Sequence, residues 1–220
     1  MKILFFGASS QIARSISNKF KFEIYGLSKK KFKHNYTELY KVNNYTNNEI
    51  KKVLKKNKIQ FDHIFFFNGT YEHSILRNYE KKNFYEVLNI NFSTIISSAL
   101  TIIENKFLQE HGSICFITSK AADNIEIGNA YYSLSKKLLN ISAKILSKEF
   151  RNIYRFNCIS SGFIKSKMSE NILNFYNLEQ KKKILRKQNN SYISKKELIK
   201  KILYLCNNKK IKGKIIKIHR

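Results

Sequence analysis

The chain has 220 residues, of which 43% are hydrophobic and 14% aromatic, so it can bury one large core and is not a disordered tail. No Pro-, Gly- or Ser-rich linker divides it, and we expect a single domain over residues 1–220. The formal net charge of +27 raises nucleic acid or an anionic membrane as a partner.

The lysines behind this charge are spread along the chain, with no basic arm and no zinc-finger spacing. Lysine, asparagine and isoleucine are plentiful while proline and tryptophan are absent, as an A/T-rich coding sequence would produce. A solvated basic surface is therefore favoured over specific nucleic-acid binding. The three widely spaced cysteines predict neither a metal site nor a disulfide framework. Because no apolar stretch reaches about 18 residues, we expect a cytoplasmic protein without a membrane span.

Short apolar runs alternate with helix-patterned segments along the chain. The runs cover residues 2–7, 22–27, 38–42, 63–69, 113–118, 154–160 and 214–218. Continuous hydrophobicity of this kind is typical of strands buried on both faces. The expected helices cover residues 9–20, 48–57, 82–109, 130–150 and 195–208. The alternation predicts an α/β fold: a doubly wound, mostly parallel, Rossmann-type sheet with helices on both faces.

Such sheets bind ligands at the carboxyl ends of their strands. The first strand ends at Gly7, where a tight turn into a helix could present free N–H groups to a pyrophosphate. Gln11 and Ala13 stand where further glycines would help, so an ordinary strand–helix turn explains this segment equally well. Asn68 and Gly69 end the fourth strand, and both residue types favour a sharp turn whether or not a ligand binds there. Together the two turns could line one cleft.

The segment GNAYYSLSKK, residues 128–137, opens a long expected helix. Each helical residue turns about 100°, so Tyr132 and Lys136 lie roughly 40° apart, while Tyr131 and Lys136 are about 140° apart. Only Tyr132 can cooperate with Lys136, whose ammonium would lower a phenol pKa that is ordinarily near 10. Tyr131 and Lys137 are then packing and surface residues. Taken alone, a Tyr-x-x-x-Lys pair is also expected by chance in this composition.

In combination these segments resemble the short-chain dehydrogenase/reductase family, in its 3-oxoacyl-carrier-protein-reductase-like branch. FGASSQIAR is similar to the T-G-x-x-x-G-x-G cofactor loop, FFNG to N-N-A-G, and NINFS to the segment with the active-site asparagine. FITS, followed thirteen residues later by YSLSK, resembles the catalytic Ser and Tyr-x-x-x-Lys. SSGFIKSKM resembles P-G-x-I-x-T, and IKGKIIKIH resembles the final strand. The shared order of these segments carries the resemblance.

The resemblance implies a catalytic tetrad of Asn91, Ser119, Tyr132 and Lys136. Tyr132 would donate a proton to a carbonyl oxygen as hydride arrives from the nicotinamide, and Ser119 would orient that carbonyl. Lys136 would depress the tyrosine pKa and bind the nicotinamide ribose, and Asn91 would hold a water that relays protons. The implied cofactor-binding residues are Gly7, Ser9, Ser10, Gln11, Ile12, Ser28, Lys29, Asn43, Asn68, Gly69, Tyr132, Lys136, Gly162 and Ile164.

Several positions outside the tetrad depart from the family pattern. Gln11 replaces the second glycine and brings a side chain toward the pyrophosphate, where it would weaken cofactor binding or contact the phosphate itself. Ala13 replaces the third glycine. The other departures are Phe6 for the threonine, Phe66 and Phe67 ahead of Asn68, Ser161 for the proline, and His219-Arg220 where D-G-G would begin.

Cofactor choice depends on the end of the second strand, where an acid would bind the adenosine ribose and exclude a 2′-phosphate. Ser28 stands there and Lys29 to Lys31 follow, so NADP(H) is favoured over NAD(H), although the same lysines could be products of composition alone. Asn43 matches the position that normally contacts adenine. Only residues 29–37 separate the second strand from the third, which shortens the usual helix between them.

Residues 162–194 resemble the variable substrate loop, whose helically spaced apolar residues could cover the substrate or simply pack on the core. We expect an NADP(H)-dependent reductase of a ketone or aldehyde, acting on a small or carrier-bound substrate such as a 3-oxoacyl thioester or a keto-sugar. A homodimer or homotetramer is expected. The alternative is a non-catalytic protein of the same fold that uses its cofactor pocket or its basic surface for binding or regulation.

Overall fold

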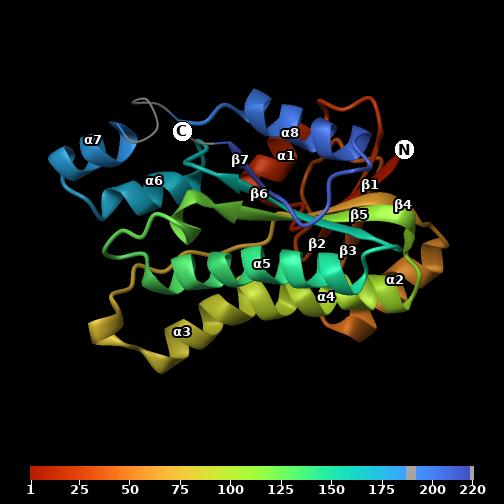
Figure 1. The fold of residues 1–220 in the computed structure, drawn as a ribbon, viewed down its shortest axis with the longest axis horizontal. Helices are drawn as coiled ribbons and strands as arrows, with labels where there is room; N and C mark the ends of the chain where they lie inside the picture. Colours follow the sequence, from red (N-terminus) through yellow and green to blue (C-terminus); the bar gives the residue numbers. More distant parts are fainter. Residues whose placement is uncertain (187–191, 219–220) are drawn as a thin grey trace.

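Seven strands form one parallel sheet in the order β3-β2-β1-β4-β5-β6-β7 (Figure 1). The computed structural model describes residues 1–186 and 192–218. Its strands are β1 (Lys2–Phe6), β2 (Glu23–Ser28), β3 (Glu38–Lys41), β4 (Phe61–Phe66), β5 (Leu108–Ser119), β6 (Arg155–Ser161) and β7 (Ile215–Ile218). The chain winds outward in both directions from the β1–β4 pair, which confirms the predicted doubly wound fold.

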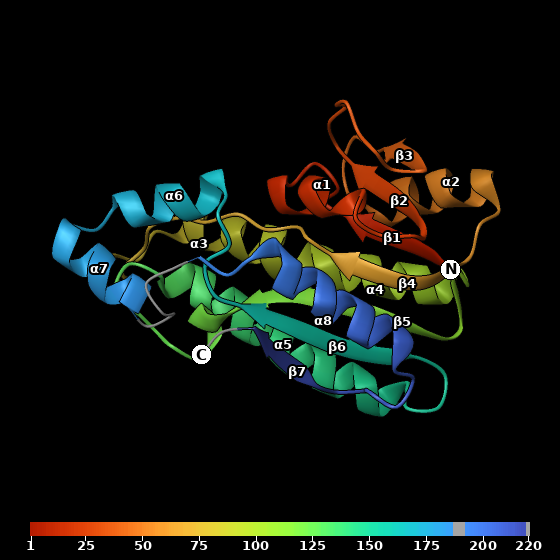
Figure 2. The same ribbon diagram turned by 90° about the horizontal axis from the view of Figure 1, so that it is seen from above.

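Helices cover both faces of this sheet (Figures 1 and 2). On one face lie α1 (Gln11–Ser17) and α8 (Lys195–Asn207), which contact each other. The other face is covered by α2 (Asn47–Asn57), α4 (Thr94–Glu104) and α5 (Ala130–Glu149), and α3 (Lys81–Leu88) leads into α4 through a π-helical turn, η2 (Asn89–Ser93). Residues 29–37 join β2 to β3 without a helix, whereas a shortened helix was predicted there.

Alternate residues of each strand pack on opposite faces of the sheet, as the two-residue period of a strand requires. In β1, Leu4 and Phe6 belong to the core cluster that includes residues of α4 and α5, while Ile3 and Phe5 belong to the cluster that includes residues of α1 and α8. Both faces of the central strands are therefore apolar, which explains their continuous hydrophobic runs.

The helix predicted over residues 82–109 is too long. α4 ends at Glu104, Lys106 adopts a left-handed conformation with φ of 54°, and β5 already begins at Leu108. Phe107 and Leu108 are buried, and the Phe107 carbonyl accepts the N–H of Phe61 at 2.9 Å. These two apolar residues continue the helical pattern in sequence, but pairing with β4 buries them more completely.

The helical run Lys81–Glu104 has the length and apolar composition that a membrane span requires, and it is the one such run in residues 1–186 and 192–218. The core helix of a globular protein passes the same test. Here Ile95, Ala99 and Ile102 are buried in the core against the sheet.

Two further helices, α6 (Lys167–Asn174) and α7 (Leu178–Arg186), lie beyond the carboxyl ends of β5 and β6 (Figure 2). A capping box starts α6: Ser166 Oγ accepts the Ser169 N–H at 3.2 Å, and Ser169 Oγ accepts the Ser166 N–H at 2.9 Å. The expected substrate loop over 162–194 thus stands at the ligand-binding edge of the sheet. Residues 187–191 within it, and His219 and Arg220, lie outside the described residues.

Candidate active site

Gly7 and Asn68, at the ends of two neighbouring strands, lie against each other. Gly7 has φ of 68°, and a Cβ added there would stand 2.8 Å from the Asn68 backbone nitrogen. A side chain is excluded on both counts, because L-residues rarely adopt this φ and the space is already filled. The turn after β1 and the turn after β4, which the sequence predicts at one edge of the sheet, are therefore in direct contact.

In the glycine-loop segment, Ser10 caps α1 by accepting the Ala13 N–H at 3.1 Å, and Ser9 and Ile12 are half-buried. The Gln11 side chain turns toward the substrate-loop helix, where its Oε1 accepts the backbone N–H of Lys167 at 2.8 Å. Ala13 is fully buried, so it serves the close helix–strand packing expected of the third glycine.

At the ends of β2 and β3, the implied cofactor residues are held by local contacts. Ser28 is buried, and its Oγ donates to the Lys30 carbonyl at 3.0 Å and accepts the Lys30 N–H at 3.1 Å. Lys29 is exposed, with its Nζ 6.0 Å from the centre of the Tyr45 ring. Asn43 donates to the Glu49 carboxylate from its backbone N–H at 2.7 Å and from Nδ2 at 3.3 Å.

Asn91 is fully buried in the π-helical turn η2, a feature often found at functional sites. Its Oδ1 accepts the Thr70 N–H at 2.7 Å, and its Nδ2 donates to the Thr70 carbonyl at 2.9 Å and to Ser135 Oγ at 3.0 Å. Asn91 thereby joins the turn after β4 to the helix that carries Tyr132 and Lys136.

Lys136 is buried, with 4% of its surface exposed, and its Nζ donates to the Ile117 carbonyl at 3.2 Å. Burial lowers the pKa of this lysine to about 8. The ammonium also closely approaches the β4 turn, because a Cβ at Gly69 would stand 3.4 Å from Nζ.

Tyr132 is half-buried, and the centre of its ring lies 5.6 Å from Lys136 Nζ. Its pKa is raised, because burial outweighs a hydrogen bond with the Ser119 side chain that acts in the opposite direction. The net shift of this pKa is therefore upward, opposite to the net depression that was expected. The phenol is protonated at neutral pH.

The neighbouring tyrosine has a different role. Tyr131 is 2% exposed, its hydroxyl oxygen accepts the Glu80 N–H at 2.7 Å, and its ring packs edge-on against Phe84. Lys137 forms an ion pair with Asp123 at 2.7 Å. Tyr131 is thus a packing residue and Lys137 a surface residue, as the helical geometry predicts.

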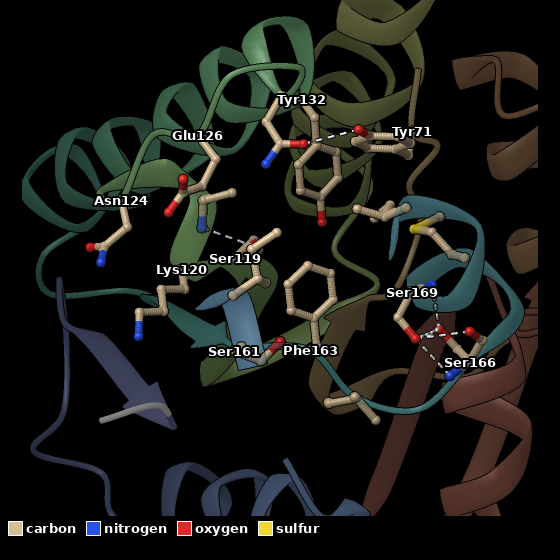
Figure 3. A pocket seen from close by; sticks show the side chains of 17 residues that line it. Tyr71, Ser119, Lys120, Asn124, Glu126, Tyr132, Ser161, Phe163, Ser166 and Ser169 are labelled. Atoms are coloured by element: carbon tan, nitrogen blue, oxygen red, sulfur yellow. Dashed lines mark hydrogen bonds between the residues drawn. The ribbon is translucent and has the colours of Figure 1, made fainter. Parts of the chain in front are cut away.

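Tyr132 and Ser119 open onto a pocket between β5, β6 and α6 (Figure 3). Gly162 and Ile164, at the end of β6, line the same pocket. The carboxyl edge of the sheet therefore holds a cavity with a phenol and a hydroxyl in it. The lining residues are Tyr71, Ser119, Lys120, Ala121, Asn124, Glu126, Asn129, Tyr132, Ser161, Gly162, Phe163, Ile164, Ser166, Met168, Ser169, Ile172 and Ile184.

A short-chain dehydrogenase family model, described as enoyl-(acyl carrier protein) reductase, matches residues 37–219 of the chain. The chain belongs to the short-chain dehydrogenase/reductase family. It is accordingly an oxidoreductase.

Solved structures of this family share the fold over nearly the whole chain. A short chain dehydrogenase family protein from Francisella tularensis has 18% identity and a TM-score of 0.86, covering 99% of this chain and 96% of its own. A gluconate 5-dehydrogenase from Burkholderia cenocepacia, in complex with NADP and tartrate, has 10% identity and a TM-score of 0.86, covering 99% and 93%. A 4-hydroxyisoleucine dehydrogenase complexed with NADH and succinate has 19% identity and a TM-score of 0.75, covering 98% and 96%. No curated protein sequence matches.

One polar group at the edge of the sheet where the family's cofactor would lie is left unsatisfied. Asn68 Oδ1, in the turn after β4, is buried without a hydrogen-bond partner among the described residues, as expected of a group that awaits a ligand. The residues present therefore fit the family's cofactor.

Sequence reasoning missed several residues of this dehydrogenase's pocket. The Tyr71 ring lies 5.8 Å from the Tyr132 ring, and Tyr71 donates its hydroxyl hydrogen bond at 3.1 Å to Gly128 O and lies 3.0 Å from Asn129 Oδ1. Its position two residues after Gly69 was an available signal. Glu126 and Phe163 line the pocket from loops, where no local pattern marks the side that faces a cavity.

Proposed function

We propose that the protein is an NADP(H)-dependent reductase of a ketone or aldehyde in which Tyr132 donates the proton. The observation that carries this proposal is the placement of Tyr132 and Ser119 in one pocket, with the buried Lys136 ammonium 5.6 Å from the Tyr132 ring. A bound nicotinamide would supply the hydride. A proton donor and a hydroxyl that orients the carbonyl are what remains for the protein to provide.

The protonated state of the Tyr132 phenol suits the reduction of a carbonyl group. Its raised pKa keeps the phenol protonated at neutral pH, so that it can give its proton to the carbonyl oxygen as negative charge develops there. Ser119, which lines the same pocket, would donate a hydrogen bond to that carbonyl oxygen and fix its position. Lys136 places a positive charge beneath the tyrosine ring and stabilises the phenolate that results.

Asn91 acts in this proposal as a positioning residue. Its three hydrogen bonds tie Thr70 to Ser135, and so hold the turn after β4 against the helix that carries the proton donor. The water-mediated proton relay that the family resemblance implies for Asn91 remains a prediction.

For the cofactor, the residues at the ends of β1, β2, β3, β4 and β6 that were identified from the sequence would hold a dinucleotide. NADP(H) is proposed over NAD(H) because exposed Lys29 to Lys31 follow Ser28, where no carboxylate opposes a 2′-phosphate. Among similar folds, the gluconate 5-dehydrogenase was solved with NADP and the 4-hydroxyisoleucine dehydrogenase with NADH, so titration has to compare both.

A homodimer or larger homo-oligomer in the cytoplasm is also proposed. Leu134, Ile141 and Ile145 on the outer side of α5 are 42%, 46% and 49% exposed and follow helical spacing, so they form an apolar stripe that a second copy could cover. Light scattering of the purified protein measures its mass, and a monomer at all concentrations would contradict this part.

The rival proposal is a non-catalytic protein of this family. Gln11 favours it, because the side chain at the second glycine position is engaged with Lys167 rather than absent. Fluorescence titration with NADPH and with NADH separates the two. The reductase requires binding of at least one reduced dinucleotide, with NADPH the tighter, and failure of both to bind rejects it.

A further inference from the structure

A second tyrosine packs against Tyr132 in the pocket. The centres of the Tyr71 and Tyr132 rings lie 5.8 Å apart and their planes meet at 66°, the edge-to-face arrangement that aromatic pairs favour (Figure 3). Both side chains line the same pocket, although Tyr71 comes from the segment after β4 and Tyr132 from the first turn of α5. The proton donor of the proposed reaction therefore has an aromatic neighbour from a separate part of the chain.

The hydroxyl of Tyr71 reaches the start of the helix that carries Tyr132. It donates to the Gly128 carbonyl at 3.1 Å and lies 3.0 Å from Asn129 Oδ1 (Figure 3). Asn129 is the N-cap residue of α5 and lies about one turn before Tyr132. Burial raises the pKa of Tyr71 well above its ordinary value near 10, so the hydroxyl keeps its proton as a hydrogen-bond donor. Tyr71 thus contacts both the proton donor and the helix terminus behind it.

The segment that carries Tyr71 is itself fixed to α5. Within the described part of the chain, the Asn129 side chain makes no capping hydrogen bond, so the free N–H groups of the first turn need other acceptors. Ser74 supplies them: its carbonyl accepts the Ala130 N–H at 3.2 Å, and its Oγ accepts the Tyr131 N–H at 3.0 Å. The Tyr71 ring therefore extends from a backbone whose position relative to α5 is set by hydrogen bonds.

The Tyr71 ring is also supported from the substrate loop. Its centre lies 6.3 Å from the centre of the Phe175 ring, which follows α6 and stacks on the His73 ring at 4.5 Å with an angle of 12° between the planes. A tyrosine side chain has only two rotatable dihedral angles, so contacts at both its ring and its hydroxyl leave it little freedom. Tyr71 is thus rigid enough to hold a neighbour in place.

Proton transfer from Tyr132 requires such a support. The phenol has to stand within hydrogen-bond reach of the carbonyl oxygen, and a displacement of about 1 Å can cost roughly a hundredfold in rate. Because Tyr132 lines a cavity, its ring is restrained only by the protein groups around it. The Lys136 ammonium lies over the ring, 5.6 Å from its centre, and the Tyr71 ring supplies an apolar contact at a defined angle.

We propose that Tyr71 is a positioning residue for the proton donor: its ring holds the Tyr132 phenol in the orientation from which the phenol protonates the carbonyl oxygen. The proposal rests on the proposed reductase function, because it gives Tyr71 a part in that reaction. The ring of Tyr71 acts on Tyr132, and its hydroxyl keeps Tyr71 itself in place through the contacts with Gly128 and Asn129.

Three variants separate these contributions. Tyr71→Leu removes the ring, whereas Tyr71→Phe keeps the ring and removes the hydroxyl. Tyr79→Leu is the matched control, because Tyr79 packs against the neighbouring Tyr131, with ring centres 6.3 Å apart, and lies outside the pocket. Circular dichroism and the Kd for NADPH establish that each variant is folded and retains the cofactor site.

The first measurement is the order of the Tyr132 ring, from NMR relaxation of ring-¹³C-labelled tyrosine with NADPH present. The signal of Tyr132 is identified by its loss in Tyr132→Phe. We expect the ring to lose order in Tyr71→Leu and to keep its order in Tyr71→Phe and in Tyr79→Leu. A Tyr132 ring that stays equally ordered in Tyr71→Leu overturns the proposal, whether or not a substrate is turned over.

The second measurement is steady-state kinetics with NADPH and 2,3-butanedione, a small diketone. Tyr71→Leu should lower kcat by about 10- to 100-fold with KM nearly unchanged, and it should increase the solvent deuterium isotope effect on kcat, because proton transfer becomes slower. Tyr71→Phe should keep most of kcat, and Tyr79→Leu should leave it unchanged. A merely structural role would lower the fraction of active protein without changing the isotope effect.

The outcomes distinguish this proposal from the proposed function. Equal losses of kcat in Tyr71→Leu and Tyr79→Leu, or an unchanged isotope effect, overturn the role of Tyr71 and leave the reductase proposal standing. If the natural chain binds NADPH but does not reduce the diketone, the order of the Tyr132 ring decides. Failure of the natural chain to bind either reduced dinucleotide rejects the reductase function itself.

Discussion

The side chain of Gln11 and the backbone of Lys167 are joined by a hydrogen bond of 2.8 Å across 156 positions of the sequence. Gln11 stands at the second glycine position of the cofactor loop, and Lys167 is the first residue of α6. Gln11, a departure from the family pattern that was expected to affect phosphate binding, thus connects the turn after β1 to the helix that lines the pocket.

Removing this bond should loosen the start of α6. In Gln11→Ala the Lys167 amide loses its acceptor, and we expect its hydrogen exchange to accelerate, with a local destabilisation of about 1 kcal/mol. Gln11→Glu keeps an acceptor oxygen at the same place and should retain the protection. Equal exchange rates in the natural chain and Gln11→Ala would show that the bond does not hold the helix.

The two adjacent tyrosines of α5 should respond differently to loss of the hydroxyl. Tyr132→Phe removes the proposed proton donor, so turnover should fall to background while NADPH binding persists. Tyr131→Phe leaves the Glu80 N–H without its acceptor and should lower the free energy of unfolding by about 0.5–1.5 kcal/mol while most activity remains. Steady-state kinetics and urea unfolding measure both effects. Equal losses of activity would refute the assignment of Tyr132.

Burial of Lys136 predicts a pH dependence of activity. Its pKa is lowered to about 8, so the ammonium loses its proton as pH rises through 8. If Lys136 must be charged to assist Tyr132, kcat/KM should decline above about pH 8. A pH–rate profile that stays flat to pH 10 would contradict this role of the ammonium.

The same group predicts a pH dependence of stability. Between pH 8 and the ordinary lysine pKa of 10.5, the unfolded chain binds a proton that the folded chain does not, so the free energy of unfolding should rise with pH across this window. The total gain is on the order of 3 kcal/mol. Urea unfolding of the natural chain relative to Lys136→Met, which cannot titrate there, isolates the contribution. A constant difference between the two proteins would count against it.

Alanine substitutions at Gly7 and at Gly69 should have different effects on stability, because only the Cβ added at Gly7 would collide with backbone. Gly7→Ala places a Cβ at positive φ and 2.8 Å from backbone, so it should destabilise the fold by more than about 1 kcal/mol and weaken NADPH binding. In Gly69→Ala the Cβ meets Lys136 Nζ at 3.4 Å, an ordinary contact, and stability should change little. Thermal unfolding compares them. A larger loss at Gly69 would reverse the interpretation.

Features that depend on near neighbours in the chain could be read from the sequence. The apolar runs of the strands follow from burial on both faces, and the pairing of Tyr132 with Lys136 follows from the turn angle of a helix. The ends of β1 and β4 could be placed at one edge because parallel strands of one sheet end on the same side. The end of α4 was misjudged, since Phe107 and Leu108 fit a helical pattern until β4 pairs with them.

The pocket was decided by contacts between distant segments, which no local pattern encodes. The Gln11–Lys167 bond, the inward carboxylate of Glu126 and the approach of Tyr71 to Tyr132 depend on how separate loops meet at the edge of the sheet. The pKa of Tyr132 also depends on contacts between distant segments. A helical neighbour predicts a shift downward, but the residues that the tertiary structure packs around the phenol bury it and shift it upward, because desolvation penalises the phenolate.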